Sequence, residues 1–94
     1  MTACFLVFRL TSECWTEVEN VMGITGKDYN TVSLEKCKLR CANERKCVAI
    51  EFYPGLGCRI FAHTSTLNLT LWSRTVLHYY KLDRTCLAGK YACL

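Results

Sequence analysis

Residues 34–58 read LEKCKLRCANERKCVAIEFYPGLGC, a stretch that predicts one helix followed by a β-hairpin. Ser33 is a good N-cap, so we expect the helix over Leu34–Ala42. Residues 48–53 then alternate between apolar and polar side chains, which is typical of a strand whose inner face carries Val48, Ile50 and Phe52. The residues Pro54-Gly55-Leu56-Gly57 predict a turn, and Cys58–Ala62 predicts the returning strand.

The sequence outside this stretch predicts three more strands and two loops. The strands are expected at Ala3–Leu10, Cys14–Val21 and Thr75–Leu82, and the loops at Gly23–Asn30 and His63–Ser73. One helix that crosses an antiparallel sheet is an α+β arrangement. We find no internal repeat and no linker, so residues 1–94 are expected to form a single domain.

Composition sets the class of protein and its compartment. The chain has 94 residues, of which 51% are hydrophobic and 21% charged, and this excludes a disordered chain. A domain this small buries little core, and its eight cysteines predict disulfides formed in an oxidising, extracellular compartment. The apolar run Ala3–Phe8 is far shorter than the roughly 20 residues of a membrane span, and it is a poor signal peptide. We therefore expect a secreted chain whose export signal lies outside this sequence.

The order of six cysteines around the helix resembles a PAN/Apple domain. The likeness runs from Cys14-Trp15, through residues 34–42 and 47–52 and Cys58, to the Val76–Tyr80 strand that leads into Cys86. It covers residues 14–86 and leaves the strand at residues 3–10 and the tail at 87–94 as additions. The resemblance implies a small disulfide-rich domain in which one helix packs on a curved antiparallel sheet. It also implies three nested disulfides, which are Cys14–Cys86, Cys37–Cys58 and Cys41–Cys47.

Two cysteines lie outside that likeness, and their pairing stays open. Cys4 and Cys93 can pair within one chain or between subunits. The first strand is apolar on both faces, and such a strand at a sheet edge invites pairing with another copy. Its candidate self-association residues are Phe5, Leu6, Val7 and Phe8.

Metal binding and catalysis are both disfavoured by the sequence. The spacing Cys37-x3-Cys41-x5-Cys47-x10-Cys58 lacks the C-x2-C pair of a zinc knuckle. His63 and His78 are present, but an even cysteine count leaves no spare thiol for a nucleophile. We expect no metal, no cofactor and no enzymatic activity.

The remaining candidates are surface groups that could bind a ligand. A basic cluster could hold a sulfated glycosaminoglycan, although a solvated helix face is the favoured explanation; its members are Lys36, Lys38, Arg40, Arg45 and Lys46. Trp72, in a polar loop, is the aromatic side chain expected to be exposed, and Asn68-Leu69-Thr70 is an acceptor triplet for N-glycosylation. The net charge of +4 is mild, and we expect neither a nucleic-acid partner nor a membrane span.

The resemblance implies a secreted, non-enzymatic module for binding or adhesion that recognises protein or carbohydrate, and some relatives bind heparin. The first strand and the extra cysteines support an alternative, a self-assembling extracellular structural protein that forms a filament or a disulfide-linked oligomer.

Overall fold

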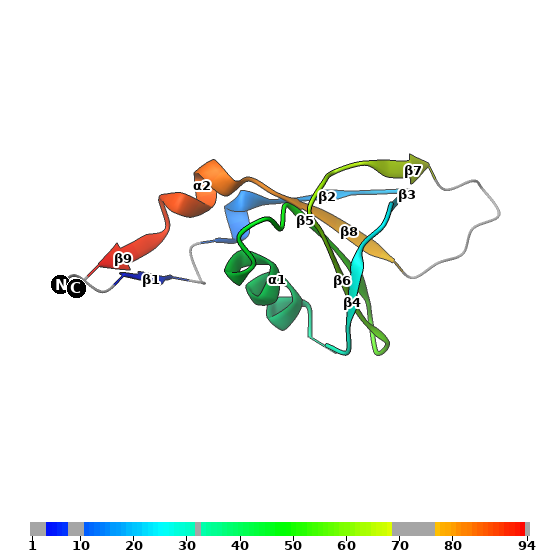
Figure 1. Ribbon diagram of the computed structural model, residues 1–94, viewed down its shortest axis with the longest axis horizontal. Helices are drawn as coiled ribbons and strands as arrows, with labels where there is room; N and C mark the ends of the chain where they lie inside the picture. Colours follow the sequence, from blue (N-terminus) through cyan, green and yellow to red (C-terminus); the bar gives the residue numbers. More distant parts are fainter. Residues whose placement is uncertain (1–3, 8–10, 32, 69–76, 94) are drawn as a thin grey trace.

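The computed structural model describes residues 4–7, 11–31, 33–68 and 77–93. A five-stranded antiparallel sheet forms its centre, in the order β2-β8-β5-β6-β4 (Figure 1). Its strands are β2 (Trp15–Val18), β4 (Lys27–Tyr29), β5 (Ala49–Tyr53), β6 (Gly57–Phe61) and β8 (His78–Leu82). Helix α1 (Leu34–Asn43) packs on one face of this sheet, and the short strand β3 (Val21–Gly23) packs on the other. The expected α+β class, with one main helix on antiparallel sheet, is confirmed.

Helix α1 forms where the sequence predicts it. The Ser33 hydroxyl oxygen accepts a hydrogen bond from the Lys36 backbone N–H at 3.4 Å, as an N-cap does. Cys37 and Cys41 lie one turn apart on the buried side of the helix, next to Ala42. The helix therefore presents its two thiol positions to the sheet and its charged side chains, except the half-buried Lys38, to solvent.

The central strand β5 is buried on both faces, which simple alternation did not predict. Ile50 and Phe52 pack into the main core under α1, as expected. Ala49 packs on the opposite face with Val21, Phe61 and Tyr79. Glu51, expected to face solvent, is 0% exposed because β3 covers that face.

Several expected boundaries were wrong because short strands form through tertiary pairing. The strand expected at Cys14–Val21 is divided by a turn at Asn20, where φ is 58°, into β2 and β3, and its first residue belongs to a 3-10 helix (Ser12–Cys14). The loop expected at Gly23–Asn30 contains β4, which pairs with β6. The loop expected at His63–Ser73 contains β7 (Thr66–Asn68), which pairs with β3.

The two additions outside residues 14–86 pair with each other. Strand β1 (Cys4–Leu6) lies within the strand expected at 3–10, of which residues 3 and 8–10 are outside the described residues, and it runs antiparallel to β9 (Tyr91–Cys93). A second helix that was not expected from the sequence, α2 (Arg84–Ala88), leads from the family core into the tail. Figure 1 shows the β1–β9 ribbon at one end of the molecule, away from the central sheet.

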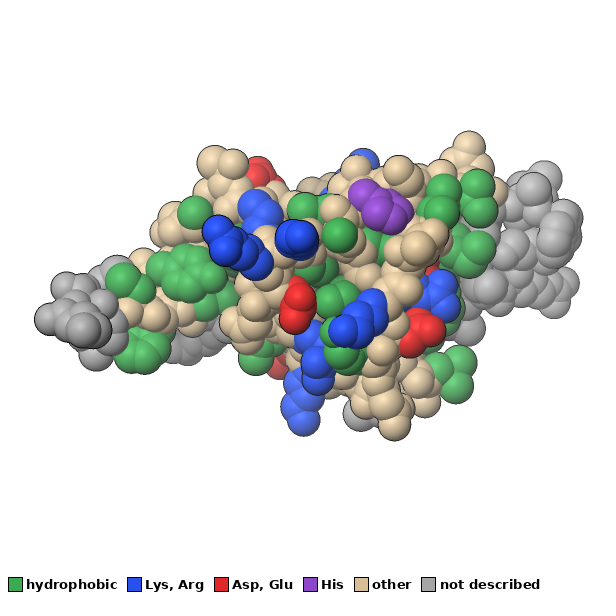
Figure 2. Space-filling model, in the orientation of Figure 1, with side chains coloured by type: hydrophobic (Ala, Val, Ile, Leu, Met, Phe, Trp, Pro, Cys, Tyr) green, Lys and Arg blue, Asp and Glu red, His purple; other side chains and the backbone are tan. Residues whose placement is uncertain are grey.

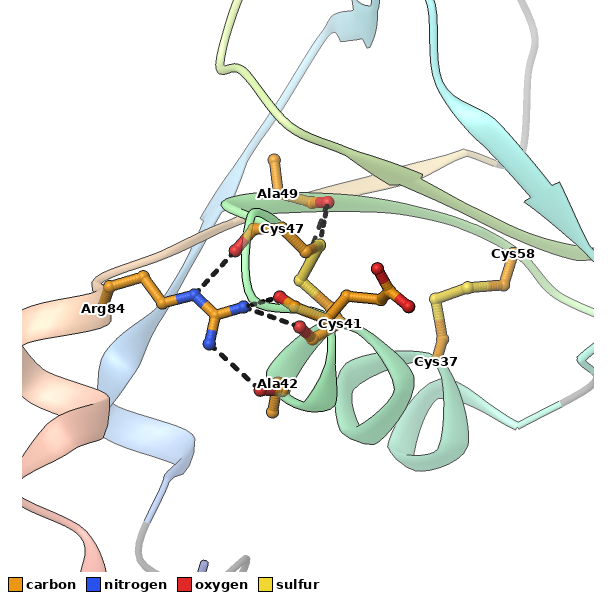
Figure 3. Close-up of a disulfide and its surroundings, with 8 residues drawn as sticks. Cys37, Cys41, Ala42, Cys47, Ala49, Cys58 and Arg84 are labelled. Carbon is orange, nitrogen blue, oxygen red and sulfur yellow. Dashed lines mark hydrogen bonds between the residues drawn. A yellow bond between two sulfur atoms is a disulfide. The ribbon is translucent and has the colours of Figure 1, made fainter.

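Three disulfides lock the core, with the pairing that the resemblance implies. They are Cys14–Cys86, Cys37–Cys58 and Cys41–Cys47. Two of them join α1 to the β5–β6 hairpin region, as Figure 3 shows for Cys37–Cys58 and Cys41–Cys47. The third joins the end of the 3-10 helix Ser12–Cys14, just before β2, to α2, and its cysteines are 72 residues apart. Cys4 lies directly opposite Cys93 in the ribbon, and Cys4 also takes part in a disulfide.

Arg84 ties the end of α1 to α2. Its guanidinium donates hydrogen bonds to the carbonyl oxygens of Cys47 at 2.8 Å, Ala42 at 3.0 Å and Cys41 at 2.8 Å, and also to that of Glu44 (Figure 3). Ala42 lies in the last turn of α1, where a carbonyl oxygen has no N–H partner within the helix, and the Cys41 and Glu44 carbonyls also accept from the backbone N–H groups of Glu44 and Cys47. Arg84 therefore acts as a structural cap that fixes the turn after the helix.

Candidate functional site

A groove lies beside α1, and most of its lining residues come from that helix. Its volume is about 610 Å³, and it lies between the solvent side of α1 and the segment that follows β4. Its lining residues are Asn30, Thr31, Lys36, Leu39, Arg40, Asn43 and Glu44. Figure 2 shows Lys and Arg side chains spread over the face of the molecule that carries α1.

Two cations of this groove come from one helix face, and one of them is held in place. Lys36 and Arg40 lie four residues apart, so their side chains are neighbours. The Arg40 guanidinium carbon lies 4.0 Å from the centre of the Tyr29 ring, and the Lys27 ammonium lies 5.5 Å from that centre. A cation over an aromatic face is attracted by the ring quadrupole. Tyr29 therefore orients positive charge at the groove before any ligand arrives.

Lys38 does not belong to this positive surface, although the sequence analysis grouped it there. Its ammonium lies 4.7 Å from the Tyr80 ring centre and 5.6 Å from that of Trp15. Burial lowers the pKa of Lys38, against the opposing effect of Glu17 and Glu35. The basic cluster is thus split by the helix periodicity, and Lys38 serves as a packing residue.

The two other basic candidates follow α1 and are exposed. Arg45 and Lys46 lie in the turn after the helix. Lys46 also lines a second hollow of about 350 Å³, together with Lys27 and Glu44. Positive side chains thus continue from the α1 groove toward β4, with Glu44 between them.

A buried carboxylate is the feature that sequence reasoning missed most clearly. Glu51 accepts a hydrogen bond from the Gly23 backbone N–H at 2.5 Å and one from the Tyr53 hydroxyl at 2.7 Å. The Arg59 guanidinium lies 3.7 Å from the same carboxylate and 2.6 Å from Asp28. Burial, then the hydrogen bond to Glu51, raises the pKa of Tyr53 to about 12. The signal in the sequence was the acidic residue in an apolar strand opposite a basic residue of its hairpin partner.

The arrangement of the Glu51 group suits a structural role. The hydrogen bond that it accepts from the Gly23 N–H joins β3 to β5 on the sheet face opposite α1. Among the residues that the structure describes, no group of three or more His, Cys, Asp or Glu side chains is placed to hold a metal ion. No helix of the described segments is long and apolar enough to cross a membrane.

Comparison with known families agrees with the fold and the disulfides. The family model of the PAN domain matches residues 14–92 of the chain. The chain belongs to the PAN domain family. The match extends into α2 and β9, beyond the core expected at residues 14–86. Searches of curated proteins and of solved structures found no significant match. PAN domains are in general non-catalytic modules that bind proteins or carbohydrates, and they are typical of extracellular proteins.

The other candidate residues of this PAN domain lie away from the groove. Asn68 is exposed at the end of β7, in a strand rather than the expected loop. Phe5 is 54% exposed, Leu6 packs against the main core and Val7 is half-buried. Trp72 and Phe8 lie outside the described residues. Trp15 is buried in the main core.

Proposed function

We propose that this PAN domain is a secreted, non-enzymatic binding module that recognises an anionic protein or glycan through the α1 groove. The observation that carries the proposal is the pair of exposed cations, Lys36 and Arg40, which share a helix face and open into one hollow. Arg40 is already oriented by Tyr29, so binding orders less of the side chain than it would for a free arginine.

Charge in a concave site supports this proposal over a uniformly solvated helix face. A cleft lined by one sign of charge raises the local concentration of ligands of opposite sign. Glu44 is the one acidic residue in the lining, against two cations, and Lys46 and Arg45 follow close by in the sequence. Sulfate and carboxylate groups are the anions that such a site accepts through charge-assisted hydrogen bonds.

A heparin column tests the proposal directly. We expect the oxidised domain to be retained, and the Lys36→Ala/Arg40→Ala double variant to elute at clearly lower salt. Lys81→Ala is the matched control, because Lys81 is exposed and alternates with the core residues Tyr80 and Leu82, so it faces away from α1. The double variant removes two positive charges and Lys81→Ala removes one, so a loss of retention in the double variant no more than about twice that in Lys81→Ala would show that net charge, rather than the groove, determines binding.

A second function, self-assembly, is supported by the β1–β9 ribbon. Phe5 is 54% exposed and Tyr91 43% exposed, so this small ribbon carries two large apolar side chains on its surface. We propose that copies of the chain associate through these two side chains. Sedimentation of the Phe5→Ser/Tyr91→Ser variant tests this, because the variant removes the two apolar side chains and deletes neither strand. We expect the variant to associate less than wild type. A wild-type protein that stays monomeric at high concentration contradicts this second function.

A further inference from the structure

The α1 groove adjoins an open sheet edge. Strand β4 pairs with β6 along one side, and no described strand lies along its other side. The chain runs directly from β4 into Asn30 and Thr31, which line the groove. An unpaired strand edge offers backbone N–H and C=O groups to another extended chain. The backbone edge and the side-chain groove therefore form one continuous surface.

The lining of the groove matches a peptide better than a purely charged polymer. Leu39 is 40% exposed and lies between Lys36 and Arg40 in the sequence, so the groove offers one apolar contact beside two cations. Asn30, Thr31 and Asn43 add neutral hydrogen-bonding groups. No aromatic ring lines the groove among the described residues, and the face of the nearby Tyr29 ring is already covered by Arg40. The groove therefore offers no free aromatic face for a sugar ring to stack on.

We propose that this surface binds an extended acidic segment of a protein partner, which adds to β4 as a strand. Side chains alternate along a strand, so every second side chain of the added segment faces α1. There its carboxylates meet Lys36 and Arg40, and one apolar side chain contacts Leu39. This inference rests on the proposed function, because it names the ligand class of the same groove.

The charges on β4 select for such a partner. The strand is three residues long, and Lys27 and Asp28 are exposed, features that discourage indiscriminate pairing with other edges. Asp28 is paired with Arg59 at 2.6 Å, so the one acidic side chain on this edge is neutralised by its neighbour. An acidic segment therefore meets Lys27, Lys36 and Arg40 without an opposing free carboxylate on β4.

The test is selection of a random dodecapeptide phage library on the oxidised full-length chain. We expect enrichment of peptides that combine Asp or Glu with one Leu, Ile or Phe. In fluorescence polarisation with the best peptide, Lys36→Ala/Arg40→Ala is expected to weaken binding about tenfold or more, and Leu39→Ala about fivefold. The matched controls, Lys81→Ala and Leu67→Ala, remove a similar exposed side chain from elsewhere and are expected to leave affinity within about twofold.

Backbone recognition is tested separately with the same peptide. N-methylation of alternate amides blocks strand addition and leaves every side chain in place, so we expect one of the two methylated sets to lose binding. Peptide binding that survives both sets overturns strand addition to β4.

The selection also separates this inference from the proposed function. A domain retained on heparin through Lys36 and Arg40, but without acidic peptides enriched from the library, overturns the inference and leaves the proposed function standing. Acidic peptides that bind wild type and Lys36→Ala/Arg40→Ala equally overturn the inference, and they overturn the proposed function as well if heparin retention is also unchanged in that variant.

Discussion

Replacement of Glu51 by glutamine tests how the second face of the sheet is held. The carboxylate accepts from the Gly23 N–H at 2.5 Å and from the Tyr53 hydroxyl at 2.7 Å, with no exposure to solvent. A hydrogen bond to a charged group contributes about 1.5–3 kcal/mol. Glutamine has a similar size but only one acceptor oxygen, so one of the two hydrogen bonds is lost. The other is weakened because its acceptor is no longer charged. We expect Glu51→Gln to lower the free energy of unfolding by about 2–4 kcal/mol.

Urea denaturation with the disulfides intact measures this loss, and hydrogen exchange locates it. The Gly23 amide is expected to exchange faster in Glu51→Gln, because its acceptor is weakened and β3 opens more often. Glu19→Gln is the matched control: Glu19 is exposed, and surface substitutions usually change stability by less than about 0.5 kcal/mol. If Glu51→Gln is as stable as Glu19→Gln, the buried carboxylate does not anchor β3 and the reasoning fails.

Three further predictions concern pH, a disulfide and a modification. Because the pKa of Tyr53 is raised from 10.0 to about 12, the folded state favours the neutral phenol; its contribution to stability is complete below pH 10.0 and is lost as the pH rises toward 12. The free energy of unfolding should decrease less steeply with rising pH in Tyr53→Phe than in wild type. The Cys14→Ala/Cys86→Ala variant should lose about 2–5 kcal/mol of stability, and unchanged urea unfolding would argue against a stabilising role for this bond. Asn68 should carry a glycan after expression in a eukaryotic secretory pathway; an intact mass equal to that of Asn68→Gln would remove this site.

The helix and the hairpin could be predicted because their signals are local. Ser33 caps α1, and the turn at Pro54–Gly57 lies between two apolar runs, so each element follows from neighbouring residues. The pairing of the six family cysteines could be reached only through the resemblance, since spacing alone leaves it open. The Cys14–Cys86 bond is an example, because the residues around each cysteine do not indicate which other cysteine it pairs with.

The short strands could not be predicted, because their pairing is decided by residues far away in the sequence. Strand β4 contains Lys27 and Asp28, which have low strand propensity, and it forms because Asp28 faces Arg59 on β6. Strand β3 is held by Glu51, 28 residues away. The burial of Glu51 itself depends on β3, so neither feature could be inferred without the other.

The candidate site was predicted in part, for a similar reason. The sequence identified the basic residues of α1, and Lys36 and Arg40 do share a groove. Lys38 was grouped with them because it is close in sequence. It projects from a different side of the helix, however, and its ammonium lies over the rings of Tyr80 and Trp15. The contribution of Tyr29, which orients Arg40, requires the position of β4 and is invisible in the sequence alone.

Chemical-shift mapping can show directly whether the α1 groove is the ligand site. The oxidised, ¹⁵N-labelled protein is titrated with a heparin-derived hexasaccharide as a defined anionic probe. We expect the largest amide shifts on the groove residues Asn30, Thr31, Leu39, Arg40 and Asn43, and little change in β8 around Lys81. Shifts concentrated on β8 or on the β1–β9 ribbon, with the groove residues unmoved, would contradict this expectation.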